Sequence, residues 1–224
     1  MVMPFVILSI WASSNVNSTF KRYSKVYSRR GLTGAQAAEQ VLKNNGVYNV
    51  RIERISGNLT DHFDPKANVI RLSDNVYGNT SAAAIGVACH EAGHAVQYVQ
   101  NYSPIKLRAA IVPITNIGSM LAMPLIVLGL VLNFMTEFSY TFVYIGIGCF
   151  GLSLLFQLIT LPVEFNASHR AVSAISGAGL LDEQELDGAK KTLRAAALTY
   201  VAAAAVSLMQ LLRLILIFGG RRDD

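Results

Sequence analysis

Charge is scarce in this chain. Lys, Arg, Asp and Glu make up 15% of its 224 residues, whereas hydrophobic residues make up 52%. Soluble globular domains carry about 25% charged residues, and three long stretches here carry none. This composition excludes a disordered chain and an ordinary cytosolic domain. It predicts a small integral membrane protein with one modest polar domain.

Cysteine is scarce as well, because Cys89 and Cys149 are the only two. They cannot build a disulfide framework, and neither belongs to a CxxC pair. The net charge is +5, but no cluster of Lys and Arg is interleaved with aromatic residues as on a nucleic-acid-binding surface. We therefore expect no nucleic-acid partner, and the basic residues suit loops that face the cytoplasm.

The uncharged stretches predict helices that cross a membrane. No charged residue lies between Arg108 and Glu137, or between Glu137 and Glu164. Both stretches exceed the roughly 20 apolar residues that cross a hydrocarbon core. Residues 111–161 are therefore expected to form a transmembrane hairpin. Its parts are the spans Ile111–Phe134 and Phe138–Leu161 and a turn near Met135–Glu137.

Further apolar segments lie near both termini. Residues 1–20 begin with an apolar run and lack the basic segment and cleavage site of a secretory signal, so they predict a retained membrane anchor. Residues 195–224 comprise a third candidate span, Ala195–Phe218, and the charged tail Arg221–Asp224. The basic residues of the tail leave open whether this segment crosses the membrane, is re-entrant or lies along the membrane.

Counts of Lys and Arg predict the orientation in the membrane. Residues 21–110 hold twelve of them and residues 162–194 hold four, whereas the turn at 135–137 holds none. Because basic loops stay on the cytoplasmic side, we expect both polar regions to face the cytoplasm.

The polar region 21–110 has the pattern of a small α+β domain. Thr33–Asn44 is typical of a capped amphipathic helix. Val47–Ile55 and Val69–Ser73 predict strands of a short antiparallel sheet. A sheet this small needs a covering helix, and Ser81–Gln100 is the candidate.

The covering helix contains the run His90-Glu91-Ala92-Gly93-His94. Histidines at i and i+4 lie on one face of a helix, so both imidazoles can bind one Zn²⁺ ion per chain. Glu91 projects beside the metal, where it can take a proton from a metal-bound water and deliver it to the leaving amine. Gly93 leaves room for a close neighbour.

A catalytic zinc keeps three protein ligands and one open position. Two spans return the chain to its starting side, so residues just after Leu161 can reach the site. Glu164 is the only acidic residue between Glu137 and Asp182, and we predict that it is the third ligand. Pro162 is well placed to begin a new helix there.

Several neighbours of Glu164 are weaker candidates. His169 lies about 140° around a helix from Glu164, so the two are not expected to bind one metal. Ser168 shares the face of Glu164 and could support a ligand. Tyr98, His169 or Arg170 could stabilise the oxyanion of the reaction, and the sequence does not choose among them.

Three segments carry a family resemblance, namely Val69–Ser73, Ala88–Gln97 and Leu161–Ser168. Together they resemble the YugP-like family of neutral zinc metallopeptidases of prokaryotic membranes. More distantly, an HExxH motif followed after a membrane hairpin by Glu164-Phe165 and Ala167 is similar to the HtpX and CAAX-protease type of membrane peptidase. Those families carry Asp where this chain has Ser168.

The resemblance implies a mostly α integral membrane protein, with transmembrane helices and a small zincin-like α+β metallopeptidase domain. It implies that His90, His94 and Glu164 bind zinc and that Glu91 is the catalytic base. It also implies that Val69–Ser73 is an edge strand that binds an extended substrate peptide. A strand that only packs on the helix remains the alternative.

We therefore predict a multi-pass zinc endopeptidase of a prokaryotic plasma membrane, with its active site facing the cytoplasm and protein or peptide substrates. A regulatory membrane partner or a second copy of the chain could restrain it. The alternatives are a catalytically silent zinc-binding scaffold and a hydrolase of lipids or small molecules. Glu91 argues against the scaffold, because a structural zinc site has no need of it.

Overall fold

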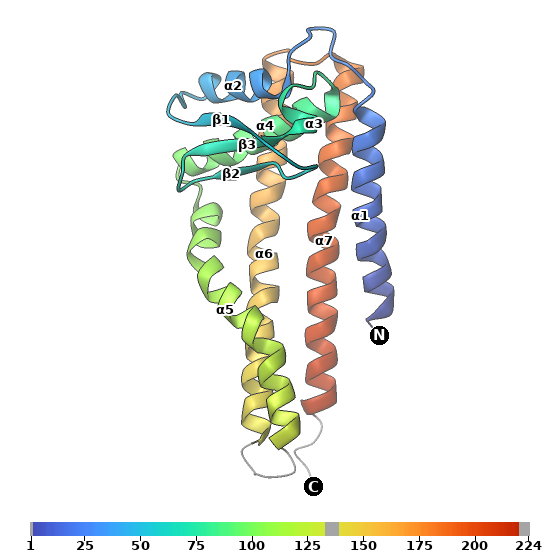
Figure 1. Cartoon of the computed structure of the whole chain (residues 1–224), viewed down its shortest axis with the longest axis vertical. Coiled ribbons are helices and arrows are strands. Elements are labelled where there is room, and N and C mark those ends of the chain that lie inside the picture. Colours follow the sequence, from blue (N-terminus) through green and yellow to red (C-terminus); the bar gives the residue numbers. More distant parts are fainter. Residues whose placement is uncertain (1, 133–138, 220–224) are drawn as a thin grey trace. The chain divides into compact units, whose positions relative to one another are not determined.

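The computed structural model describes residues 2–132 and 139–219. The predicted turn near Met135–Glu137 and the tail Arg221–Asp224 lie outside the described residues. The described chain is mostly helical with one small sheet (Figure 1). Its elements are α1 (Met3–Tyr23), α2 (Gly34–Asn44), β1 (Arg51–Ile55), β2 (His62–Asp64), β3 (Val69–Ser73), α3 (Asp74–Tyr77), α4 (Ala82–Val99), α5 (Ser103–Leu132), α6 (Ser139–Gly177) and α7 (Glu183–Gly219).

The chain divides into two compact units, and α1, α5, α6 and α7 each contribute to both. We call them the apolar unit and the α+β unit. The apolar unit comprises Met1–Trp11, Lys106–Leu161 and Tyr200–Asp224, and the α+β unit comprises Ala12–Ile105 and Pro162–Thr199.

Capping residues fix where the two predicted helices of the α+β unit begin. The Thr33 hydroxyl accepts from the Gln36 backbone N–H, and the Gln36 side chain accepts from the Thr33 backbone N–H, which together form a capping box at α2. The Ser81 hydroxyl accepts from the Ala84 N–H at the start of α4. Both helix predictions are confirmed.

The three strands form a mixed sheet in the order β1-β3-β2. β2 and β3 pair antiparallel, but β1 pairs parallel to β3, so the prediction of an antiparallel sheet is wrong for that pair. β3 is the most apolar strand, with Val69, Ile70 and Leu72 fully buried. It therefore takes the central position, and the charged β1 and the short β2 form the edges, as edge strands commonly do.

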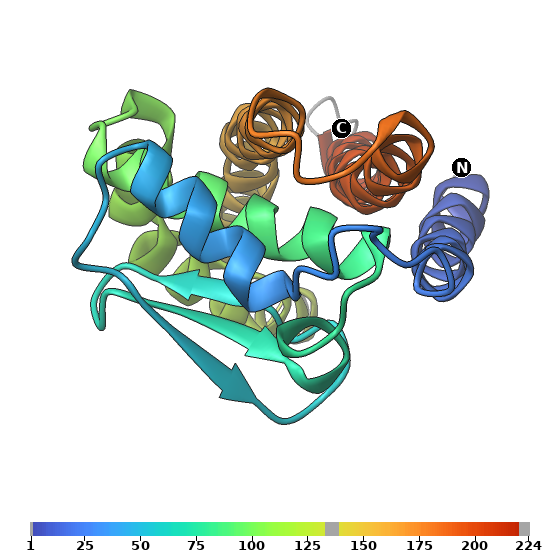
Figure 2. The same ribbon diagram turned by 90° about the horizontal axis from the view of Figure 1, so that it is seen from above.

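Helix α4 lies in the middle of the α+β unit. Its alanines pack into one core with α2 and β3. Gly86 lies against Ala189 of α7, and Gly93 lies against Ala167 of α6. Figure 2 shows the sheet on one side of α4 and the ends of α6 and α7 on the other. This position explains why nearly every residue of α4 is buried.

Three of the described helices, α5, α6 and α7, are long and apolar enough to cross a membrane. They contain the described residues of the predicted spans, whereas α1, which holds most of the predicted N-terminal anchor, is not among these three. Within the apolar unit, Gly129 and Gly146 bring α5 and α6 into close contact beside Val143 and Ile126. Contacts of this kind, with small residues between helices, are typical of membrane helix pairs.

Pro162 does not begin a helix, contrary to the prediction, because α6 runs through it without interruption from Ser139 to Gly177. A proline inside a helix removes one backbone hydrogen bond. The residues that follow compensate, since Val163, Ala167 and Ala171 form a fully buried stripe at helical spacing. Tertiary packing thus keeps Glu164 on the same helix as the second apolar span.

Candidate metal centre

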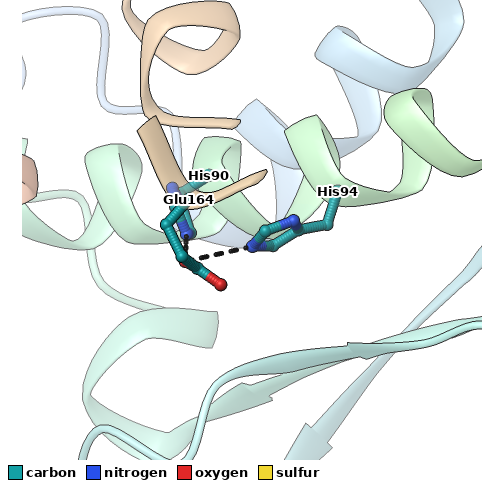
Figure 3. Close-up of side chains that lie close together, drawn as sticks. All are labelled: His90, His94 and Glu164. Atoms are coloured by element: carbon teal, nitrogen blue, oxygen red, sulfur yellow. Dashed lines mark hydrogen bonds and ion pairs between the residues drawn. The ribbon is translucent and has the colours of Figure 1, made fainter. Parts of the chain in front are cut away.

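Two imidazoles and one carboxylate meet on the face of α4 that lies against α6. His90 and His94 are one turn apart on α4, with their ring centroids separated by 4.7 Å. Glu164 reaches them from α6, as Figure 3 shows. Its Oε2 lies 3.2 Å from His90 Nε2 and 3.5 Å from His94 Nε2. The structure therefore brings together all three residues predicted as metal ligands.

A glycine allows α6 to come close enough for this contact. A Cβ atom on Gly93 would lie 2.8 Å from the backbone oxygen of Ala167 on α6, which is closer than van der Waals contact allows. Gly93 stands between the two histidines in the sequence, and Ala167 stands three residues after Glu164. The predicted room beside His94 is thus occupied by the backbone that carries the carboxylate.

The spacing of the three ligand atoms fits a zinc ion. Atoms that bind a tetrahedral zinc at 2.0–2.2 Å lie about 3.3–3.6 Å from one another. The two distances from Glu164 Oε2 are close to this range, and all three ligand atoms lie within 4.8 Å of each other. Two histidines and one glutamate are also a donor set of catalytic zinc sites, where the fourth position stays open.

The charge of Glu164 suits a metal ligand. Its side chain is only 4% exposed, and burial on its own would raise its pKa. The hydrogen bonds with His90 and His94 outweigh burial, so the pKa of Glu164 lies below its ordinary value. The carboxylate is consequently ionised at neutral pH, as a zinc ligand must be.

Glu91 differs from Glu164 in its electrostatic surroundings. Burial raises its pKa to about 7; the charge of His90 opposes this shift, and the carboxylates of Glu164 and Asp61 add to it. A carboxyl group with a pKa near neutrality can both accept and release a proton at physiological pH. This is the property required of the predicted catalytic base.

The second nitrogen of each imidazole also has a partner. His90 Nδ1 lies 3.1 Å from the Ser168 hydroxyl on α6, the support predicted from its spacing with Glu164. His94 Nδ1 lies 3.0 Å from Oε1 of Gln97, a fully buried side chain one turn further along α4. Partners of this kind orient the imidazoles of metal sites. Gln97 was not predicted, although a glutamine three residues from a histidine on a buried helix is a usable signal.

The weaker candidates lie elsewhere. His169 is exposed and is not part of the His90, His94 and Glu164 group. Arg170 donates to the side chains of Asn166 and Gln100. That one of Tyr98, His169 and Arg170 stabilises the oxyanion remains a prediction.

The prediction that Val69–Ser73 is an edge strand is wrong, because β3 is paired on both sides. The edge strand that contacts α4 is β2, whose Phe63 ring lies 6.0 Å from the ring of Tyr98 at the end of α4. The ring of His62, at the start of β2, bonds to the Thr60 carbonyl. The three-residue β2 escaped notice because it is too short for an alternating pattern.

Comparison with known proteins adds independent information. Residues 1–219 match the protein family described as "Putative neutral zinc metallopeptidase". A protein of Bacillus subtilis (strain 168) named "Putative membrane protease YugP" is 47% identical over 217 residues, which cover 97% of this chain and 94% of that protein. No solved structure matches the chain. The region matched by the family contains all four residues of the candidate site.

Proposed function

Because the chain belongs to the YugP-like family of neutral zinc metallopeptidases, we propose that it is a membrane-embedded zinc endopeptidase that hydrolyses peptide bonds at the cytoplasmic surface. The observation that carries this proposal is the meeting of one carboxylate oxygen of Glu164 with Nε2 of both His90 and His94. His90, His94 and Glu164 hold one zinc ion per chain. Zinc bound there would supply Lewis acidity toward water and the peptide carbonyl.

Glu91 carries the proton through the reaction. Its carboxylate accepts a proton from the attacking water as the new bond to the peptide carbon forms, and it then donates that proton to the leaving amine. A pKa of about 7 makes both transfers feasible at neutral pH. Glu91 is buried next to His90 on α4, so its carboxyl group lies close to the proposed metal ligands.

An extended substrate peptide pairs with the free edge of β2. This strand has one edge bonded to β3 and contacts α4, where its Phe63 ring lies 6.0 Å from the ring of Tyr98. Its length of three residues limits backbone pairing to a short stretch of peptide. Side-chain contacts near the site would then supply the remaining affinity.

The polar regions 21–110 and 162–194 form the catalytic domain on the cytoplasmic side, and residues 111–161 form the transmembrane hairpin. The apolar character of α5, α6 and α7 supports insertion into the plasma membrane, as does the name of the Bacillus subtilis relative. The distribution of Lys and Arg supports the orientation. Residues 1–20 and 195–224 are further membrane segments in this proposal.

A catalytically silent zinc-binding scaffold is the second candidate. It would need the same three ligands but no proton carrier. The presence of Glu91 with a pKa near neutrality favours the enzyme.

The test uses the purified full chain in detergent, zinc and unfolded casein as substrate. Wild type should cleave casein, a chelator should stop cleavage, and zinc should restore it. Glu91→Gln should lower the rate by about 10²–10⁴-fold, the usual contribution of a general acid–base group, while the zinc content stays near one per chain. A Glu91→Gln protein that cleaves as fast as wild type would rule out the assigned base. A zinc-loaded wild type without any hydrolytic activity would favour the scaffold.

A further inference from the structure

Gln97 is a fully buried polar residue whose side chain has a complete set of hydrogen bonds. Its Nε2 donates to the backbone carbonyl of Val163 and to Oδ1 of Asn166, both at 2.9 Å and both on α6. Its Oε1 lies 3.0 Å from Nδ1 of His94. One amide therefore connects a predicted ligand on α4 with the helix that carries Glu164.

The orientation of this amide is determined by its partners. A backbone carbonyl can only accept, so the amide atom that faces Val163 must be the NH₂ group. Asn166 Oδ1 also accepts from Arg170 Nε at 2.7 Å, and a guanidinium can only donate. Both contacts on α6 thus place the NH₂ group there and leave Oε1 facing His94.

A carbonyl oxygen facing an imidazole nitrogen needs a proton on that nitrogen. His94 must therefore carry a proton on Nδ1, so Nε2 is the nitrogen that can offer a lone pair to a metal once it carries no proton. Nε2 is the atom that lies 3.5 Å from Glu164 Oε2. The hydrogen bond to Gln97 consequently selects the neutral tautomer that can bind a metal at this position.

The other imidazole has no such selection. Ser168 presents a hydroxyl to His90 Nδ1, and a hydroxyl can donate or accept with equal ease. Gln97 is bonded to α6 at two points and is fully buried, whereas Ser168 is only partly buried. The partner of His94 Nδ1 thus determines where the proton lies, whereas the partner of His90 Nδ1 does not.

We propose that Gln97 is a positioning residue that holds His94 in the tautomer with its proton on Nδ1 and its Nε2 lone pair directed at the metal. This inference rests on the proposed zinc-binding function of His94. Partners of metal-bound histidines change metal affinity about 10–100-fold when they are removed. Gln97 acts through His94 and has no contact with substrate in this proposal.

Two substitutions separate this role from simple packing between α4 and α6. Gln97→Glu keeps an oxygen for His94 Nδ1–H but loses both donors to α6. Gln97→Met fills similar space and loses all three hydrogen bonds. Gln100→Met is the matched control, because Gln100 also connects α4 to α6, through Arg170, without touching an imidazole.

The first readout is the tautomer of His94 in zinc-free wild type at about pH 8, above the usual pKa of histidine. Nitrogen NMR of protein labelled at its four histidines distinguishes the two ring nitrogens, and His94 is assigned by substituting the other three in turn. We expect a proton on Nδ1, the nitrogen that faces Gln97 Oε1. The opposite tautomer, or an equal mixture, would overturn the inference without any variant.

The second readout is the zinc dissociation constant. We expect Gln97→Met to raise it about 10–100-fold, Gln97→Glu to stay within about threefold of wild type despite lower thermal stability, and Gln100→Met to leave it unchanged. If both Gln97 variants lose stability while their zinc affinity stays at the wild-type value, Gln97 only packs the helices and the inference is wrong. A wild type that binds no zinc contradicts the proposed function instead, so the two failures are distinguishable.

Discussion

The two units of the molecule each contain a glycine at a close approach between helices. In the α+β unit a Cβ on Gly93 would lie 2.8 Å from the backbone oxygen of Ala167, and in the apolar unit a Cβ on Gly146 would lie 2.8 Å from that of Ala122. Neither position accepts a Cβ unless the facing helix shifts, and Gly146 is the tighter of the two because Ile126 also lies close to it. The contact at Gly93 brings Glu164 to His90 and His94. The contact at Gly146 joins α5 and α6 and involves none of these predicted ligands.

The surroundings of the two contacts differ. Around Gly93 the neighbouring residues of α4 are almost all buried by protein. In the apolar unit many large side chains remain exposed, including Met120 at 71%, Leu216 at 64% and Val131 at 61%. An exposed apolar surface of this extent is expected for helices that contact lipid. Close packing at a glycine thus accompanies a candidate metal site in one unit and a helix pair in the other.

The largest effect is expected for the loss of Glu164, and it tests whether the α+β unit binds the metal. Glu164→Ala should weaken zinc binding about 100-fold or more, beyond the range for a residue that only supports a ligand. Glu185→Gln is the control, because Glu185 is also a buried carboxylate of this unit but bonds to the backbone N–H groups of Arg29 and Asp182. Competition titration with a zinc chelator measures both constants.

The control variant should lose thermal stability, because a weaker acceptor replaces a buried carboxylate, and should keep its zinc. Equal zinc affinity in wild type and Glu164→Ala would remove Glu164 from the site. In that case the α+β unit would have no complete ligand set among its described residues.

The next prediction substitutes the matched glycines. Gly93→Ala introduces an overpacking strain of about 1–3 kcal/mol, and the strain can relax by moving α6 and Glu164 away from the imidazoles. Zinc binding would have to restore the strained geometry. If the zinc-free protein relieves about 1.4 kcal/mol of strain in this way, zinc affinity therefore falls about tenfold. Gly146→Ala has at least the same steric cost, because its Cβ would meet Ile126 as well as Ala122, but it should lower only the thermal stability. Calorimetry and zinc titration on both variants measure the two effects.

We expect only the glycine of the α+β unit to affect zinc binding. A Gly146→Ala protein whose zinc binding is weakened as much as that of Gly93→Ala would contradict this expectation. That outcome would mean that packing in the apolar unit is coupled to the geometry of the site. A Gly93→Ala protein with unchanged zinc affinity would show instead that α6 adjusts without moving Glu164.

The sequence predicted those parts of the candidate site that depend on local spacing. His90 and His94 must share a face of any helix that contains them, and Glu164 stood out as the one acid in a long interval. Ser168 followed from its helical spacing with Glu164. The spacing of Gln97 from His94 was a usable local signal, but its bonds to Val163 and Asn166 depend on α6, whose position relative to α4 no local pattern describes.

The sheet was predicted less well for a related reason. Val69–Ser73 was identified with its correct bounds, but the order β1-β3-β2 depends on which strand is buried on both sides. The continuation of α6 through Pro162 also depends on packing, here of Val163 and Ala167 against their neighbours. In both cases a long-range contact overrode a local signal.

A smaller effect is expected from the serine that supports His90. Ser168→Ala removes the hydroxyl 3.1 Å from Nδ1, but a water molecule can replace a partner that is only partly buried. We expect zinc affinity to fall about threefold, less than the 10–100-fold typical of supporting residues and less than for Gln97→Met. A loss above tenfold in a zinc titration would contradict the proposed difference between the two imidazoles.

The smallest effect is expected from the corresponding serine contact in the apolar unit. Ser119 and Ser153 place their hydroxyl oxygens 2.6 Å apart between α5 and α6. Hydrogen bonds between membrane helices contribute about 0.6 kcal/mol on average, so Ser119→Ala should lower the thermal stability in detergent only slightly. Zinc affinity should equal that of wild type, because no predicted ligand depends on this pair. A fall in zinc affinity as large as that of Ser168→Ala would mean that the apolar unit helps to set the metal geometry, and the separation between the two units would have to be abandoned.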